Sequence, residues 1–182
     1  VINVAMPSTY HFLEKVIDEI VRMYQDAGVE LTAFHVGGDE VPEGIWEGSS
    51  ICRTFMQENG LTKIRDLKDY FLEQILEMLD KRNIQAVGWQ DIVMNPDNTV
   101  NEHFRNSKVL NYCWNTIPEQ GGDEVPYKLA NAGYPIILCN VGNFYLDMAY
   151  CYHVDEPGLR WGGYVDEYVT LDMLPFDIYK SL

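Results

Sequence analysis

The sequence has few basic residues and no long apolar segment. It contains 13 Lys and Arg against 28 Asp and Glu, which gives a formal net charge of -15 over 182 residues. An acidic surface of this kind repels phosphate backbones and therefore argues against nucleic acid as a partner. No run of about 18 apolar residues occurs, which argues against a transmembrane helix. The sequence therefore predicts a protein that neither binds nucleic acid nor spans a membrane.

Cysteine is also scarce, and its spacing excludes the common zinc motifs. The 4 cysteines include no CxxC pair, so a zinc knuckle is not expected. They are Cys52, Cys113, Cys139 and Cys151. Reduced core thiols and one or two disulfides both fit this pattern. The histidines, which are His11, His35, His103 and His153, show no ligand spacing, and we predict neither a metal nor a cofactor.

The chain contains enough hydrophobic and aromatic residues to form a folded core. Hydrophobic residues make up 47% and aromatic residues 13% of the sequence. That composition is typical of a globular domain with a real core and is unlike that of a disordered chain. The chain begins at Val1, in the middle of a pattern and without a secretory signal. We therefore expect it to be a piece of a longer protein.

Hydrophobic periodicity predicts alternating helices and strands. Helices are expected from an N-cap at Ser8 to a stop at Gly28, from Ser49 or Ser50 to about Asn59, over 66–81 and over 123–132. Strands are expected over 31–36, 84–89, 108–113 and 135–141, and the last forty residues read as loops with one short helix. Short continuous apolar strands are typical of a parallel sheet that helices cover on both faces. A doubly wound α/β sheet and a (β/α)8 barrel both fit, and no GxGxxG motif supports a dinucleotide fold.

The predicted strands end in residues that carry chemistry. The first runs into His35, Asp39 and Glu40, the second into Trp89, and the others into Trp114 and the segment Tyr145-Leu146-Asp147. Reactive groups collect at the carboxyl ends of parallel strands in both candidate folds. A purely structural sheet has no need of this pattern, so we expect a functional site there.

The pair Asp39-Glu40 indicates acid–base chemistry. The glycines Gly37 and Gly38 precede the pair and allow the backbone to turn, so that both carboxylates can reach one pocket. Two such close carboxylates do not ionise together easily, and an acid beside a charged partner is the equipment of glycosidic bond cleavage. The alternative is a helix cap or a surface carboxylate, which spacing alone leaves equally open.

The aromatic residues indicate a sugar as the ligand. Sugar rings have apolar faces edged by hydroxyls, and Trp89 and Trp114 provide matching walls. Either tryptophan alone is better explained by core packing, but two at equivalent strand ends favour binding. His35 lies within its strand and is interpreted as a buried support of the pocket, not as a metal ligand.

The segment Phe34-His35-Val36-Gly37-Gly38-Asp39-Glu40-Val41, with Trp46 downstream, closely resembles the H-x-G-G-D-E signature of glycoside hydrolase family 20, the β-N-acetylhexosaminidases. Supporting matches are the Pro7-to-Phe12 helix entry, Gly88-Trp89-Gln90-Asp91, Trp114 and Tyr145-Leu146-Asp147. The resemblance runs through the chain in the family's order. It implies a (β/α)8 catalytic barrel and retaining hydrolysis assisted by the 2-acetamido group of the substrate.

The resemblance also implies a role for each matched residue. Glu40 would be the general acid and base, Asp39 would orient the acetamido group, and Tyr145 would donate a hydrogen bond to the acetamido oxygen. Substrate-binding roles would fall to the residues that line the sugar pocket. These are Trp89, Trp114, Asp147 and, as a support, His35.

The chain matches only part of the family's barrel. The family's substrate-binding Arg from the first strand and Trp from the eighth strand have no counterpart, and Trp161 reads as a loop or substrate-rim residue. A (β/α)8 barrel takes about 250 residues and eight strands. We therefore expect residues 1–182 to be a fragment of a single glycoside hydrolase catalytic domain, a partial TIM barrel that holds strands four to seven.

A fragment of this kind has consequences for activity and assembly. The parent enzyme is expected to hydrolyse terminal β-linked N-acetylhexosamine, whereas the isolated fragment is expected to have little or no activity. Its open core favours a homodimer or cover by its own C-terminal segment. The alternatives are a non-catalytic carbohydrate-binding module and a metal-dependent hydrolase. A periplasmic or secreted parent follows from the family alone, and gluco versus galacto preference, linkage and compartment stay open.

Overall fold

The computed structural model describes residues 2–42, 44–107 and 109–174. The chain divides into two compact units, Val1–Val87 and Gly88–Leu182. Each unit is built from helices and parallel strands in alternation. The predicted α/β class is therefore confirmed.

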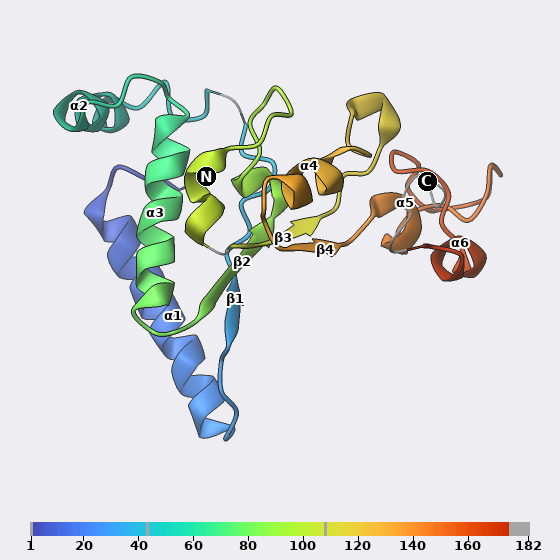
Figure 1. Ribbon diagram of the computed structural model, residues 1–182, viewed down its shortest axis with the longest axis horizontal. Helices are drawn as coiled ribbons and strands as arrows, with labels where there is room; N and C mark the ends of the chain where they lie inside the picture. The colour runs from blue at the N-terminus through green and yellow to red at the C-terminus, as the bar shows by residue number, and fades with distance from the viewer. Residues whose placement is uncertain (1, 43, 108, 175–182) are drawn as a thin grey trace. The chain divides into compact units, whose positions relative to one another are not determined.

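The first unit holds the long helices. Its elements are α1 (Pro7–Asp26), β1 (Ala33–His35), α2 (Ser50–Asn59), α3 (Asp66–Asp80) and β2 (Gln85–Trp89), the last of which continues into the second unit (Figure 1). Three of these elements match the predicted ranges closely, because α2, α3 and β2 are amphipathic or continuously apolar over most of their length. β1 is shorter than the predicted 31–36.

The second unit has shorter elements. They are the 3-10 turns η1 (Gln90–Ile92), η2 (Glu102–Ser107) and η3 (Pro118–Gln120), the strands β3 (Leu110–Cys113) and β4 (Ile136–Leu138), and the helices α4 (Val125–Asn131), α5 (Val141–Phe144) and α6 (Glu167–Leu171). The predicted strand over 135–141 is too long, since Val141 opens α5. The last forty residues are expected to be loops with one short helix, and α6 is a short helix in the part of that segment that the structure describes; residues 175–182 lie outside it.

The sheet is parallel, and its strands follow the order β1-β2-β3-β4. In β1 and β2, Phe34 lies opposite Ala86. In β3 and β4, Tyr112 lies opposite Ile137. Parallel neighbours with helical crossovers between them are the repeating unit of a (β/α) fold.

The expectation that every strand is buried on both faces is wrong for two strands. β2 is buried over its three central residues. By contrast, β1 alternates between exposed and half-buried residues, and Ile137 in the middle of β4 is 37% exposed. β1 and β4 are the outermost strands of this sheet. An outermost strand has a neighbour on one side only, and its side chains therefore lose part of their cover.

Helix ends follow the predicted capping residues with one exception. The Ser49 side chain accepts a hydrogen bond from the Cys52 N–H at 3.2 Å, and Gly60 closes α2 in the left-handed conformation at φ 66°. The predicted cap at Ser8 is wrong, because α1 already begins at Pro7 after an extended Met6. Proline suits the first helical position, since the N–H that it lacks has no partner there in any helix.

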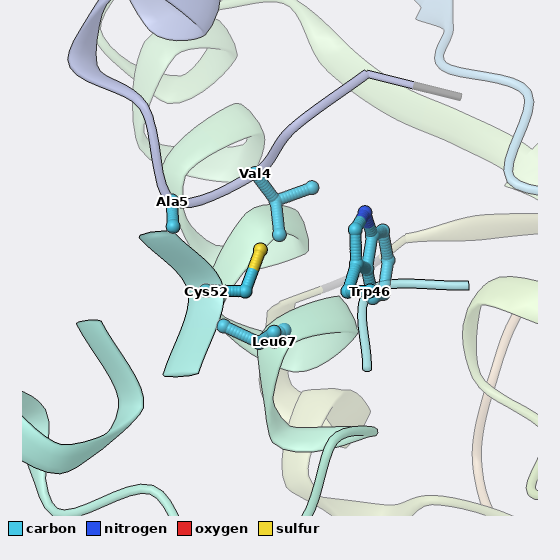
Figure 2. Close-up of a cluster of buried hydrophobic side chains, with 5 residues drawn as sticks. All are labelled: Val4, Ala5, Trp46, Cys52 and Leu67. Atoms are coloured by element: carbon cyan, nitrogen blue, oxygen red, sulfur yellow. The ribbon is translucent and has the colours of Figure 1, made fainter. Parts of the chain in front are cut away.

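One buried hydrophobic cluster of the first unit includes residues just before α1. Val4, Ala5, Trp46, Cys52 and Leu67 are buried against one another (Figure 2). The Trp46 indole N–H donates to the Ile2 carbonyl at 3.1 Å. This tryptophan belongs to the signature, and its place in the structure is a core position that ties the loop after β1 to the chain before α1.

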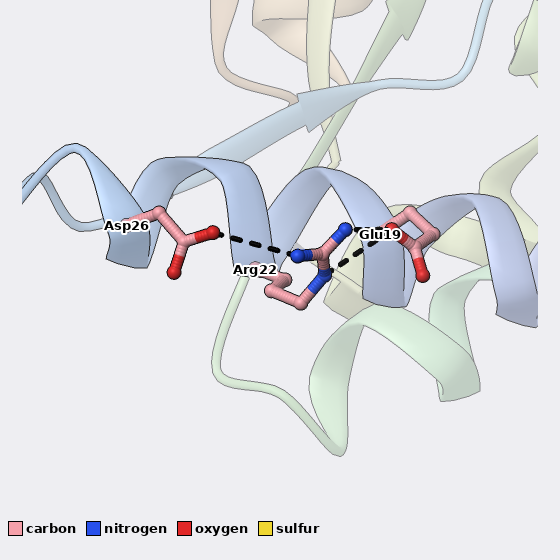
Figure 3. Close-up of polar contacts among 3 residues, drawn as sticks. All are labelled: Glu19, Arg22 and Asp26. Carbon is pink, nitrogen blue, oxygen red and sulfur yellow. Dashed lines mark hydrogen bonds and ion pairs between the residues drawn. The ribbon is translucent and has the colours of Figure 1, made fainter.

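Helix α1 carries an exposed face of charged residues. Arg22 bridges Glu19 at 2.6 Å and Asp26 at 3.5 Å, one turn apart on the same exposed face (Figure 3). The hydrogen bond from Arg22 lowers the pKa of Glu19 below its ordinary value. On its other side α1 meets α3 through the Tyr10 and Tyr70 rings, whose centroids lie 5.9 Å apart. Ile17 is the buried residue of α1, whereas Phe12 and Tyr24 are 63% and 42% exposed, so the apolar side of the helix is only partly covered.

The four cysteines are free thiols, so no disulfide joins them. Cys113 lies fully buried in β3, and burial raises the pKa of its thiol to about 12. Of the helices in the described ranges, none combines the length and the apolar character that a membrane span requires.

Candidate active site

The carboxylate pair follows β1 on a tight left-handed turn. Gly37 and Gly38 have φ values of 71° and 92°, and Glu40 has φ 48°. Positive φ costs glycine little, whereas a side chain rarely adopts it. The glycines therefore allow the turn that the sequence predicts, and both Asp39 and Glu40 are exposed beyond it. Glu40 is thus in a left-handed conformation that is uncommon for a residue with a side chain.

His35 supports this turn directly. Its Nδ1 accepts a hydrogen bond from the Gly37 N–H at 3.1 Å. A neutral imidazole carries its proton on the other nitrogen when Nδ1 accepts. The interpretation of His35 as a buried residue is wrong, since the side chain lies exposed in β1. Its partner is the backbone of the signature turn.

Acidification is expected to weaken this turn. Partial desolvation lowers the pKa of His35, although the charge of Asp39 opposes the shift. An unfolded chain then takes up the proton at a higher pH than the folded one does, so the free energy of unfolding falls as pH decreases below about 6.5. Protonated Nδ1 also becomes a donor and loses the Gly37 N–H.

An NMR titration of the histidine ring protons checks this prediction, with His35→Gln to assign the resonance. The midpoint for His35 should lie below its ordinary value, and the substitution should flatten the pH dependence of unfolding in the same range. A midpoint at or above the ordinary value would contradict it.

In the second unit, the ends of β2 and β3 are joined by side chains. The Gln90 Oε1 accepts from the N–H groups of Trp114 at 2.9 Å and Asn115 at 3.2 Å. The Asp91 Oδ2 accepts from the Trp114 indole N–H at 2.7 Å. Gln90 is 5% exposed, so its two bonds lie away from solvent. The predicted site residue Trp114 is thus held at its backbone and at its ring.

Three aromatic rings meet beyond these strand ends. The ring of Trp161 lies edge-on to Trp114, with centroids 6.1 Å apart, and edge-on to Tyr145 at 5.9 Å. Edge-to-face pairs at this separation are favourable. The structure therefore brings together two predicted site residues through Trp161, which the sequence analysis placed at a loop or rim. In the sequence, the two glycines that follow Trp161 were the feature that could have indicated a close approach of this loop to the site.

Glycine is required beside Trp161. A Cβ at Gly162 would lie 2.3 Å from the Val141 Cγ2, a distance that no packed side chain tolerates. The loop that carries Trp161 can therefore approach α5 closely. Trp161 is 48% exposed and borders a hollow of about 520 Å³. The other lining residues are Thr116, Ile117, Pro118, Glu119, Val141, Gly142, Arg160, Gly162, Gly163, Tyr164 and Val169.

The two remaining predicted residues lie in the same unit. Trp89 ends β2 and packs edge-on against Tyr112 of β3, with ring centroids 6.0 Å apart. Asp147 is exposed, and its carbonyl accepts from the Leu159 N–H at 2.8 Å. The candidate residues thus form two groups, one with His35, Asp39 and Glu40 in the first unit and one in the second.

Within the described ranges, no group of three or more His, Cys, Asp or Glu side chains is arranged to hold a metal ion. The chemistry of the strand ends is instead that of carboxylates and aromatic rings. Active sites of (β/α) enzymes lie at the carboxyl ends of the strands, and aromatic rings there offer flat apolar faces to a ligand.

Comparison with known proteins names the family. Residues 1–180 match the family described as glycosyl hydrolase family 20, catalytic domain. A beta-hexosaminidase of Vibrio vulnificus is 30% identical over 162 residues, which cover 88% of this chain and 19% of that protein. A beta-hexosaminidase of Vibrio furnissii is 30% identical over 164 residues, 90% of this chain and 24% of that protein.

The fold agrees with this match. The crystal structure of a GH20 exo beta-N-acetylglucosaminidase from Vibrio harveyi in complex with N-acetylglucosamine is similar over 100% of this chain and 27% of its own, with a TM-score of 0.76 and 27% identity. The chain belongs to glycoside hydrolase family 20. It is a partial barrel of that fold and spans about a quarter or less of the length of these relatives.

Proposed function

We propose that the protein hydrolyses terminal non-reducing β-linked N-acetylhexosamine, with residues 1–182 as part of a single catalytic domain. The observation that carries this proposal is the turn after β1, where Gly37 and Gly38 allow two adjacent carboxylates to follow the strand. The family and the beta-hexosaminidase relatives support it. The substrate class is that of N-acetylglucosamine- and N-acetylgalactosamine-containing glycans.

The proposed mechanism uses the substrate's own acetamido group. Glu40 protonates the leaving oxygen and then acts as the base that activates water. Asp39 holds the acetamido N–H and stabilises the positive charge that develops in the oxazolinium-like intermediate. The acetamido oxygen attacks the anomeric carbon with the high effective molarity of an internal group, so no protein nucleophile is needed. The configuration at the anomeric carbon is retained.

The second group of residues binds the terminal sugar in this proposal. Tyr145 donates a hydrogen bond to the acetamido oxygen as that oxygen attacks, and Asp147 binds hydroxyls at the edge of the ring. Trp89 and Trp114 line the ring and the acetamido group, and His35 supports the turn that carries Asp39. Both Tyr145 and Trp114 contact the Trp161 ring, which adds a further apolar wall.

The isolated chain is proposed to have little or no activity. The exposed residues of β1 and the 37% exposed Ile137 in β4 are what an incomplete barrel leaves open. A homodimer of the isolated chain is one way to cover them. Light scattering of the isolated chain tests this, and a stable monomer would argue against the dimer.

Calorimetric titration of the full-length protein tests the proposed function. A thiazoline that mimics the oxazolinium should bind at least about 100-fold more tightly than N-acetylglucosamine, because an enzyme is complementary to the transition state. NMR of the first product should show the β anomer. Equal affinities for the sugar and the thiazoline, without turnover, would indicate a non-catalytic carbohydrate-binding module instead.

A further inference from the structure

Asp91, two positions after Trp89, has no role in the proposed mechanism, but its side chain contacts a residue of the proposed sugar pocket. Gln90 and Asp91 form the 3-10 turn η1 directly after β2. Each directs a side-chain oxygen to Trp114, which follows β3: Gln90 to the backbone N–H and Asp91 to the indole N–H. We call these two residues the bracket.

The bracket removes the freedom that a tryptophan at a strand end otherwise has. Gln90 holds the backbone of Trp114 and Asn115, which sets the position of the Cα–Cβ bond. Rotation about the two side-chain torsions remains, and the hydrogen bond of 2.7 Å to the Asp91 carboxylate selects one orientation. A bond of this length to a charged acceptor is among the stronger hydrogen bonds in proteins.

The bracket also determines which atoms of the Trp114 side chain are available to contact a ligand. The indole N–H is already donated to Asp91, so Trp114 offers ring carbons and not a hydrogen-bond donor. An apolar wall of this kind suits a methyl group or the carbon face of a sugar. The Trp161 ring meets Trp114 edge-on at 6.1 Å, and its position therefore depends on the orientation that Asp91 selects.

We propose that Asp91 is a positioning residue, which acts through Trp114 to set the apolar wall of the sugar pocket. The expected effect on substrate affinity rests on the proposed function. The orientation of the Trp114 ring by Asp91 does not depend on that function. A merely structural tie between two strand ends would support stability and leave substrate affinity unchanged.

Steady-state kinetics of the full-length protein on a chromogenic N-acetylglucosaminide test the consequence. Asp91→Ala is expected to raise KM by about fivefold to tenfold, with a smaller change in kcat. This is less than the full worth of a charge-assisted hydrogen bond, because the bond orients the Trp114 ring and does not itself touch the substrate. Asp91→Asn retains an acceptor oxygen and should restore most of the affinity. In the Trp114→Phe background, which has no indole N–H, Asp91→Ala should change KM by less than about twofold if the two act as a pair.

The matched control is Asp155→Asn, since the Asp155 side chain is 87% exposed in the same unit and faces the nearby His153 at 3.7 Å. It should leave both constants unchanged. A KM for Asp91→Ala within twofold of the original, in a folded protein by circular dichroism, would overturn the proposal, as would additive effects in the two backgrounds.

A second measurement reads the orientation of the ring without activity. In protein labelled with 5-fluorotryptophan, Trp114→Phe identifies the 19F resonance of Trp114. Asp91→Ala should shift and broaden that resonance, whereas Asp155→Asn should not. If the unmodified protein neither binds nor hydrolyses the glycoside, the proposed function is wrong. The 19F spectrum still tests the positioning role of Asp91 in that case. An unchanged Trp114 resonance in Asp91→Ala would overturn that role.

Discussion

Replacement of Glu40 by Gln in the full-length protein is expected to reduce turnover by about 100-fold or more on substrates with poor leaving groups. Glutamine has nearly the same shape but no carboxyl proton to give to the leaving oxygen. On a nitrophenyl glycoside, whose leaving group needs little protonation, the loss should be smaller. The measurement is kcat/KM on both kinds of substrate, and the difference between the two losses identifies the general acid.

The control for this substitution is Glu58→Gln, at an exposed glutamate of α2 outside the signature. It should leave both rates unchanged. The thiazoline should still bind to the Glu40→Gln protein, because Asp39 and the aromatic residues remain. Full activity of Glu40→Gln on the poor leaving group would refute the assignment of Glu40.

The second large effect concerns stability. Leu67→Ala in the full-length protein is expected to lower the free energy of unfolding of the first unit by about 2–5 kcal/mol. Leu67 is fully buried at the start of α3, where it packs in the cluster with Val4, Trp46 and Cys52 (Figure 2). Truncation removes buried apolar contacts and leaves a cavity, because the packed neighbours relax only partly into the space.

Urea unfolding followed by circular dichroism measures this loss. Val29→Ala is the matched control, since Val29 is 56% exposed in the same unit, and it should change stability by less than about 0.5 kcal/mol. A loss for Leu67→Ala no larger than that of the control would show that the cluster does not hold the unit together.

Local features of the sequence predicted local features of the structure well. Ser49 and Gly60 mark the ends of α2 because capping and the left-handed stop depend on a few neighbouring residues. The glycines before Asp39 predicted a turn for the same reason, and positive φ values are found there. The start of α1 was misplaced at Ser8, since Pro7 fits the first helical position without a side-chain cap.

Burial was less predictable. The apolar runs of β1 and β4 indicated strands covered on both faces, but the cover of a strand depends on its place in the sheet. β2, which has a neighbour on each side, is buried at its centre, and the outermost strands are not. Trp46, a signature residue, belongs to the core of the first unit, as its 9% exposure shows.

The sequence by itself determined the class, the family and the residue types that carry the chemistry, since periodicity, turns and the signature are properties of neighbouring residues. Only the tertiary structure decided which of these residues work together. Asp91 and Trp114 are separated by 23 positions, and Trp161 meets Trp114 from a loop further along the chain. Such pairs depend on the path of the backbone between them, which parallel strand pairing sets and which no local pattern contains.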